Sequence, residues 1–186
     1  MSRDHRISFL SVEGSNAKFV ADFICSSPKV EFAGLMLCAA FTTAPNIFMD
    51  FALLGTVPLL APLKVFPPVV GWYKRRYKDT WNTSDRLVTL VQRSDRLRLT
   101  LLHATGDNVI PWRHCESLFY ATASAASGRE LTRAEIDDRK QTYELGEGGW
   151  LCRWHVDDKI IKQRIVKYGG KLHCCQFLTK CLLDRT

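Results

Sequence analysis

The sequence predicts an α/β fold in which a mostly parallel sheet is flanked by helices. Residues 97–103 are rich in leucine and threonine and alternate in the manner of a strand. A small polar turn follows them, and Pro111 stands where a helix can begin. The chain contains about four strand-like segments, and its 186 residues, 46% of them hydrophobic, suffice to bury one core. A single domain over residues 1–186 is therefore expected.

The polar turn after residues 97–103 contains one acid, Asp107, between the turn-forming residues Gly106 and Asn108. In open α/β sheets, ligands bind at the edge where the carboxyl ends of the strands lie. The order of strand, acidic turn and helix therefore predicts that Asp107 is an active-site acid. The alternative is that Asp107 only forms and caps its own turn.

Residues 99–111, LTLLHATGDNVIP, resemble the acid-bearing turn of the α/β-hydrolases, in particular the lipase- and esterase-like members of fungal type. In that family, a strand of the form L-x-L-x-H-A runs into a G-D or D-D turn followed by V-x-P. Three further segments resemble the family in the same order: 7–14, the strand and turn of the nucleophile; 32–41, the next buried strand; and 161–170, the last strand and its glycine turn. The resemblance implies a partial α/β-hydrolase fold, namely its carboxyl-terminal half, with the earlier strands preceding Met1.

The segment 49–73 is the most apolar part of the chain. It is not expected to span a membrane, because Lys64 and four prolines interrupt it: Pro58, Pro62, Pro67 and Pro68. The resemblance implies that residues 44–90 form an apolar cap over the pocket, which suits an acyl or aromatic ester and allows peripheral contact with a membrane. In the alternative interpretation, short helices here only cover the edge of the sheet.

Charge and cysteine content exclude several classes of function. The net charge is +7, but outside the run at 74–78 the basic residues are scattered among 19 acids, and no nucleic-acid-binding motif occurs. The number of cysteines, seven, is odd, and no apolar signal-peptide core follows residues 1–6. We therefore expect a cytoplasmic protein with reduced thiols that does not bind nucleic acid. No C-x-x-C pair, metal-ligand cluster or phosphate loop occurs, so neither a metal nor a cofactor is expected.

Two segments near the carboxyl end have recognisable local patterns. Residues 131–141 are typical of an exposed helix, and Thr132 and Glu135 have the spacing of a capping box. Residues 146–154 begin with a glycine turn and continue with aromatic residues. They are expected to form either an additional hairpin strand or a loop that rests on the cap.

The resemblance implies a serine nucleophile, an acid and a histidine base in that order along the chain. The nucleophile turn G-x-S-x-G aligns with Leu10 to Gly14, and Val12 then stands where the serine belongs. Val12 has no nucleophilic atom and tolerates the strained turn poorly. The candidate nucleophiles are therefore Ser11 and Ser15, although Ser15 also suits the start of the next helix.

The base position also departs from the family pattern. The family ends its last strand in a turn such as Y-G-G-H, and here Lys171 follows Gly170. The candidate base is His173, two residues later; alternatively, His173 belongs to a helix over residues 172–183. His103 and His114 flank the acid, and the family histidine that His103 matches does not act as a base.

These positions lead to two hypotheses of function. In the first, the chain is a serine hydrolase by descent that acts on carboxylic or lipid acyl esters through an acyl-enzyme, with Asp107, His173 and Ser15 or Ser11 as its site. The departures at Val12 and Lys171 then imply weak or absent activity, because a triad acts as a unit. In the second, the chain is a non-catalytic pseudo-hydrolase, an interaction protein or a gene remnant.

Overall fold

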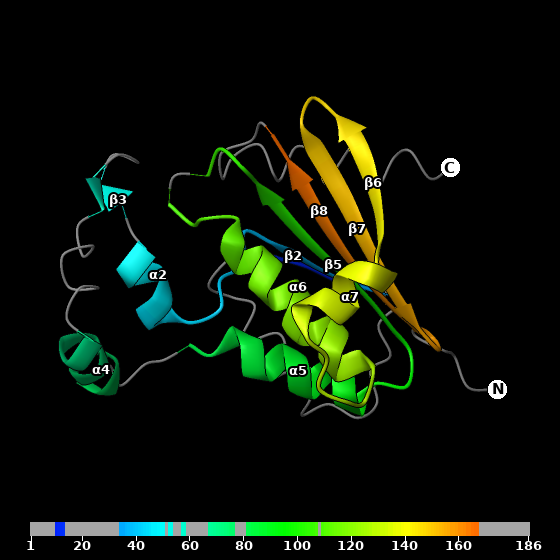
Figure 1. Ribbon diagram of the computed structural model, residues 1–186, viewed down its shortest axis with the longest axis horizontal. Helices are drawn as coiled ribbons and strands as arrows, with labels where there is room; N and C mark the ends of the chain where they lie inside the picture. Colours follow the sequence, from blue (N-terminus) through cyan, green and yellow to red (C-terminus); the bar gives the residue numbers. More distant parts are fainter. Residues whose placement is uncertain are drawn as a thin grey trace.

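The computed structural model of the chain describes residues 10–13, 34–50, 52–53, 57–58, 67–76, 81–107 and 109–167 (Figure 1). These residues form a six-stranded sheet in the order β1-β2-β5-β8-β7-β6 and a separate two-stranded sheet. The six strands are β1 (Leu10–Glu13), β2 (Leu35–Cys38), β5 (Leu97–Ala104), β8 (Lys159–Val166), β7 (Gly149–Val156) and β6 (Gln141–Gly146). The smaller sheet pairs β3 (Ala52–Leu53) with β4 (Val57–Pro58). The helices are α2 (Ala44–Asp50), α4 (Pro67–Arg76), α5 (Thr83–Arg93), α6 (Arg113–Ala126) and α7 (Arg133–Arg139).

One half of the large sheet is parallel. β1 pairs with β2, β2 with β5 and β5 with β8, all in the same direction. The predicted strand at 97–103 is confirmed as β5, which alternates apolar residues along its first half and is buried throughout its second half. The carboxyl ends of these four strands consequently share one edge of the sheet.

The other half of the sheet is antiparallel, so the prediction of a mostly parallel sheet is wrong. β8 pairs antiparallel with β7, and β7 pairs antiparallel with β6. Two tight turns reverse the chain: Glu147 and Gly148, at φ 49° and 78°, join β6 to β7, and Asp157, at φ 48°, lies between β7 and β8. Positive φ at both central residues is typical of a tight hairpin turn. Residues 149–156 therefore form a hairpin strand rather than a loop on the cap.

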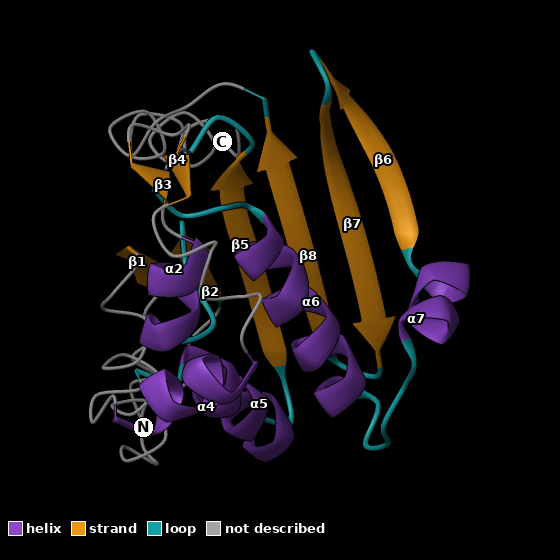
Figure 2. Ribbon diagram, turned by 60° about the vertical axis from the view of Figure 1, so that its left-hand side comes forward, coloured by secondary structure: helices purple, strands orange, loops and turns teal. Residues whose placement is uncertain are grey.

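Helices α5 and α6 cover one face of the sheet (Figure 2). Asn82 caps α5, since its side chain accepts a hydrogen bond from the Asp85 backbone N–H at 3.2 Å. The buried face of α5 includes Leu87, and that of α6 includes Phe119. Both side chains belong to the principal core, which also includes residues of β5 and β8, and none of their surface is exposed.

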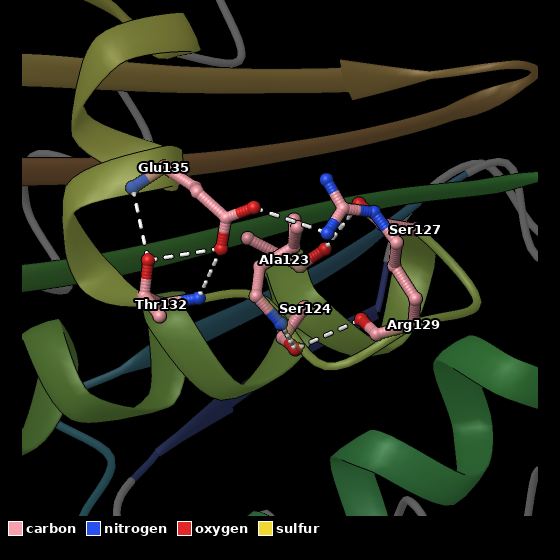
Figure 3. Close-up of polar contacts among 7 residues, drawn as sticks. Ala123, Ser124, Ser127, Arg129, Thr132 and Glu135 are labelled. Carbon is pink, nitrogen blue, oxygen red and sulfur yellow. Dashed lines mark hydrogen bonds and ion pairs between the residues drawn. The ribbon is translucent and has the colours of Figure 1, made fainter.

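The predicted capping box at the start of α7 is confirmed. The Thr132 hydroxyl accepts the Glu135 N–H at 3.3 Å, and the Glu135 carboxylate accepts the Thr132 N–H at 2.8 Å (Figure 3). Arg129 adds a donor to the other carboxylate oxygen of Glu135 at 3.1 Å. The hydrogen bonds from Thr132 and then the one from Arg129 lower the pKa of Glu135 to about 2. The loop between α6 and α7 is thus fixed by a small charged network.

The segment 44–90, predicted to be a cap, contains α2, the β3–β4 pair, α4 and most of α5. Leu87 and Leu90 of α5 belong to the principal core, whereas α4 exposes Val69 and Trp72, the latter to 60%. Whether the earlier part closes over a pocket stays a prediction. Among the helices in the described part of the chain, none combines the length and apolar composition needed to cross a membrane.

Candidate active site at the carboxyl ends of the parallel strands

Asp107 lies just beyond the carboxyl end of β5, as the sequence predicts. Its Oδ1 accepts hydrogen bonds from the backbone N–H of Val109 at 2.9 Å and of Ile110 at 3.0 Å. Only 5% of the side chain is exposed. The carboxylate therefore holds its own turn through one oxygen, as the turn-forming interpretation requires. These two bonds do not use Oδ2, so they also leave an oxygen that can accept from a second group.

His103 is the second-to-last residue of β5, and its ring lies near this carboxylate. Its ring is fully buried, with Nε2 at 2.7 Å from the Ile110 carbonyl oxygen and 3.9 Å from Asp107 Oδ2. A nitrogen that bonds a carbonyl oxygen must carry the proton, so Nδ1 of the neutral ring is the unprotonated atom. Nδ1 has no hydrogen-bond partner within the described residues. His103 thus ties β5 to the following turn and is poorly placed to serve as a base.

Because the pKa of His103 is lowered in the folded protein, the protein is expected to be less stable at acidic pH. Burial lowers this pKa from its usual 6.5, and the Ile110 carbonyl and Asp107 only partly oppose the effect. Below pH 6.5 the unfolded chain then binds a proton that the folded chain does not bind. The free energy of unfolding is therefore expected to fall between pH 7.5 and 5.5, by at most about 1.4 kcal/mol per pH unit from this group.

Urea denaturation at several pH values measures this loss, with His103→Gln as the matched variant. The Gln variant has no titrating ring at this position, so its curve is expected to be flatter than that of the wild type. Identical pH dependence in the two proteins would contradict the assignment to His103.

The loop after β2 meets α6 at the same edge of the sheet. Ala39 takes φ 50° and donates its N–H to the Leu102 carbonyl at 2.9 Å, which keeps the loop against β5. Thr42 Oγ1 lies 3.1 Å from Nδ1 of His114 in the first turn of α6. Nδ1 of His114 is therefore engaged, and 5% of this side chain is exposed. The edge gathers a carboxylate, a hydroxyl and two imidazoles from three segments.

One candidate nucleophile, Ser11, lies inside β1, as does Val12. The backbone of Ser11 pairs with Met36 and that of Val12 with Leu37, so both are inside the strand. Ser15, like the candidate base His173 and its neighbour Lys171, lies outside the described residues. Because β1 is two strands from β5 and parallel to it, the carboxyl end of β1 lies about 10 Å from the line of β5, at the same edge of the sheet as Asp107.

Other reactive groups of the described chain are not suited to this chemistry. Cys38, Cys115 and Cys152 are buried thiols that form no disulfide. Burial raises the pKa of the Cys115 thiol far above its usual value, so this thiol stays protonated and is a poor nucleophile. Among the residues that the structure describes, no group of three or more His, Cys, Asp or Glu side chains could hold a metal ion.

Comparison with known proteins gives no relative for this chain. No protein-family model matches the sequence. A search of the curated proteins also finds no significant match. A proposal of function for this chain consequently depends on its own residues and on the placement of Asp107 at one edge of the sheet.

Sequence reasoning missed the part that His103 plays in this site. The bond from its ring to the Ile110 carbonyl joins residues seven positions apart, and it forms only when the turn has the conformation that Asp107 stabilises. The available signal was a histidine in an otherwise apolar strand, because a buried imidazole requires a polar partner. That signal indicates a partner but not which one.

Proposed function

We propose that the chain is a serine hydrolase by descent that acts on carboxylic or lipid acyl esters. The observation that carries this proposal is the anchored carboxylate of Asp107 at the edge of the sheet where β1, β2 and β5 all end. An acid of a catalytic triad must be held rigidly and largely away from water. The two backbone donors on Oδ1 hold the carboxylate of Asp107 in place, and only 5% of its side chain is exposed.

In the proposed reaction, Ser15 or Ser11 supplies the attacking oxygen and His173 accepts its proton. Attack on the ester carbonyl gives a tetrahedral intermediate, which expels the alcohol as the imidazolium returns the proton. Water then hydrolyses the acyl-enzyme by the same steps. Asp107 orients the imidazole and stabilises its positive charge. This sequence of steps requires neither a metal nor a cofactor.

The proposed substrate is a small-molecule or lipid ester whose apolar part contacts the segment 44–90. Val69 and Trp72 of α4 support this choice, because they expose apolar surface on this segment. The same helix exposes Arg75, a combination of aromatic and basic side chains that suits peripheral contact with a lipid surface. We place the protein in the cytoplasm as part of this proposal.

A second candidate is a non-catalytic pseudo-hydrolase, and two observations favour it. Val12 occupies the aligned nucleophile position and lies inside β1, where it pairs with Leu37 of β2. His103, the described histidine nearest the acid, is buried and bonded to a backbone carbonyl. A protein of this kind would keep the architecture and act through a partner or have no present role.

Labelling with a fluorophosphonate probe tests the proposal. A folded sample is expected to react at one serine, and Ser15→Ala or Ser11→Ala is expected to abolish the reaction, as is His173→Ala. Ser94→Ala is the matched control, because the Ser94 hydroxyl bonds the Leu90 carbonyl at the end of α5, just before β5 begins and therefore at the opposite edge of the sheet from Asp107. No labelling of the folded protein would exclude the hydrolase, and labelling that survives both the Ser11 and the Ser15 substitution would exclude the assigned nucleophiles.

A further inference from the structure

A cavity of about 270 Å³ lies at the end of the sheet opposite Asp107. It is lined by Ser127, Arg129, Arg139, Trp154, His155 and Val156. Val156 pairs with Lys159, which pairs with Leu97 at the start of β5. Because β5 has eight residues, this edge is about 25 Å from the edge that holds Asp107. Figure 2 shows the end of β7 beside α7, away from the carboxyl ends of β5 and β8.

Basic groups dominate the polar lining of this cavity. Arg139 ends α7, is exposed and has neither an ion-pair nor a hydrogen-bond partner among the described residues. Arg129 donates one of its five N–H groups to Glu135, so most of its donors are available. His155 adds an exposed imidazole. Glu135 forms an ion pair with Arg129, whereas Asp158, in the turn after β7, is paired with Arg96 at 3.4 Å and does not line the cavity.

The guanidinium of Arg129 is held in position before any ligand arrives. Glu135 accepts from Arg129 through one oxygen and from the Thr132 backbone and hydroxyl through the other, so the capping box orients the carboxylate (Figure 3). A donor that is already oriented loses less conformational entropy on binding an anion than a free side chain loses. Arginine also presents its donors in a planar fork that matches phosphate and carboxylate oxygens.

The remaining lining consists of Ser127 and the apolar side chains of Trp154 and Val156. Trp154 is 4% exposed and belongs to the principal core, and Val156 packs against that core. A ligand that fits this lining has an apolar or aromatic portion to contact Trp154 and Val156 and an anionic group to reach the arginines. We propose that this cavity binds a small ligand that carries a phosphate or carboxylate group on a flat apolar portion. The site is independent of the proposed hydrolase chemistry.

Calorimetric titration with phenyl phosphate tests this proposal on the full chain. Saturable binding is expected, and Arg139→Gln and Arg129→Gln are each expected to weaken it about tenfold, the effect of losing a charge-assisted hydrogen bond. Arg133→Gln is the matched control, because it removes the same charge from the same helix while Arg133 lies over the Tyr120 ring rather than in the cavity. The exposed Arg139 is not needed for folding, and circular dichroism verifies that each variant folds.

A second titration, with vesicles containing phosphatidic acid, distinguishes a soluble ligand from a lipid headgroup. Binding of phenyl phosphate that depends on Arg139 supports a soluble ligand, and vesicle binding with the same dependence supports a headgroup. The proposal is overturned if neither probe binds or if Arg133→Gln weakens binding as much as Arg139→Gln does. If vesicle binding does not depend on Arg139, the proposal that the cavity binds a lipid headgroup is also overturned.

Discussion

Replacing Asp107 by asparagine is expected to lower kcat/KM for hydrolysis of a short p-nitrophenyl ester by about 10³-fold to 10⁴-fold, the loss typical of neutralising a triad acid. The amide oxygen of asparagine can still accept the N–H groups of Val109 and Ile110, so the turn is expected to persist. Only the negative charge that stabilises the imidazolium is removed. The change thus separates the proposed chemical role of Asp107 from its structural one.

Asp107→Ala provides the comparison for this experiment. Alanine removes both acceptor bonds, one of them exposed and the other part-buried, so the free energy of unfolding should fall by about 1–2 kcal/mol. The asparagine variant should lose much less. If the folded asparagine variant hydrolyses the ester as fast as the wild type does, Asp107 is a turn residue and nothing more.

His103→Ala is expected to lower the free energy of unfolding by about 3–4 kcal/mol, the second large effect. The substitution leaves a cavity where the fully buried ring was, and it leaves the Ile110 carbonyl without the donor that now lies at 2.7 Å. The turn that carries Asp107 loses its attachment to β5 as a consequence. Urea denaturation followed by circular dichroism measures the effect.

His103→Gln is the matched variant, because its side-chain amide can place an N–H near the former position of Nε2. We expect this variant to recover most of the loss and to differ from the wild type by about 1 kcal/mol. Equal destabilisation by alanine and glutamine would show that packing rather than the bond to Ile110 holds the turn.

The sequence predicted best where neighbouring residues decide the structure. The strand at 97–103, the turn at Asp107 and the capping box of α7 all depend on residues within a few positions of one another. Predicted and observed structures agree closely at these places. Helix α6 begins at Arg113, two residues after Pro111.

The sheet was predicted less well, because strand direction depends on partners distant in sequence. The sheet was expected to be mostly parallel, and a hairpin strand at 146–154 was only one of two alternatives, whereas hairpins place both β7 and β6 beyond β8. Glu147 made one of these turns difficult to predict, because glutamate is uncommon at a positive φ such as its 49°. Gly148 and the glycine-aromatic pattern at 146–154 were the available signals.

The position of Asp107 was predicted from the sequence, whereas the contacts around it were not. The placement of Asp107 at the edge follows from the strand pattern alone, whereas the contact of His103 with Ile110 requires the folded turn. The loop after β2 is a second example, because its Thr42 meets His114 of α6 across 72 positions of sequence. Such long-range contacts depend on the packing of whole elements and have no local sequence signal.

The most direct test of a serine-hydrolase site that includes Asp107 is the time course of fluorophosphonate labelling of the wild type and of Asp107→Asn, each shown to be folded by circular dichroism. The proposal predicts that the wild type is labelled at Ser11 or Ser15 and that the folded asparagine variant reacts slower by orders of magnitude. A folded wild type that stays unlabelled, or equal labelling of the two proteins, would contradict it.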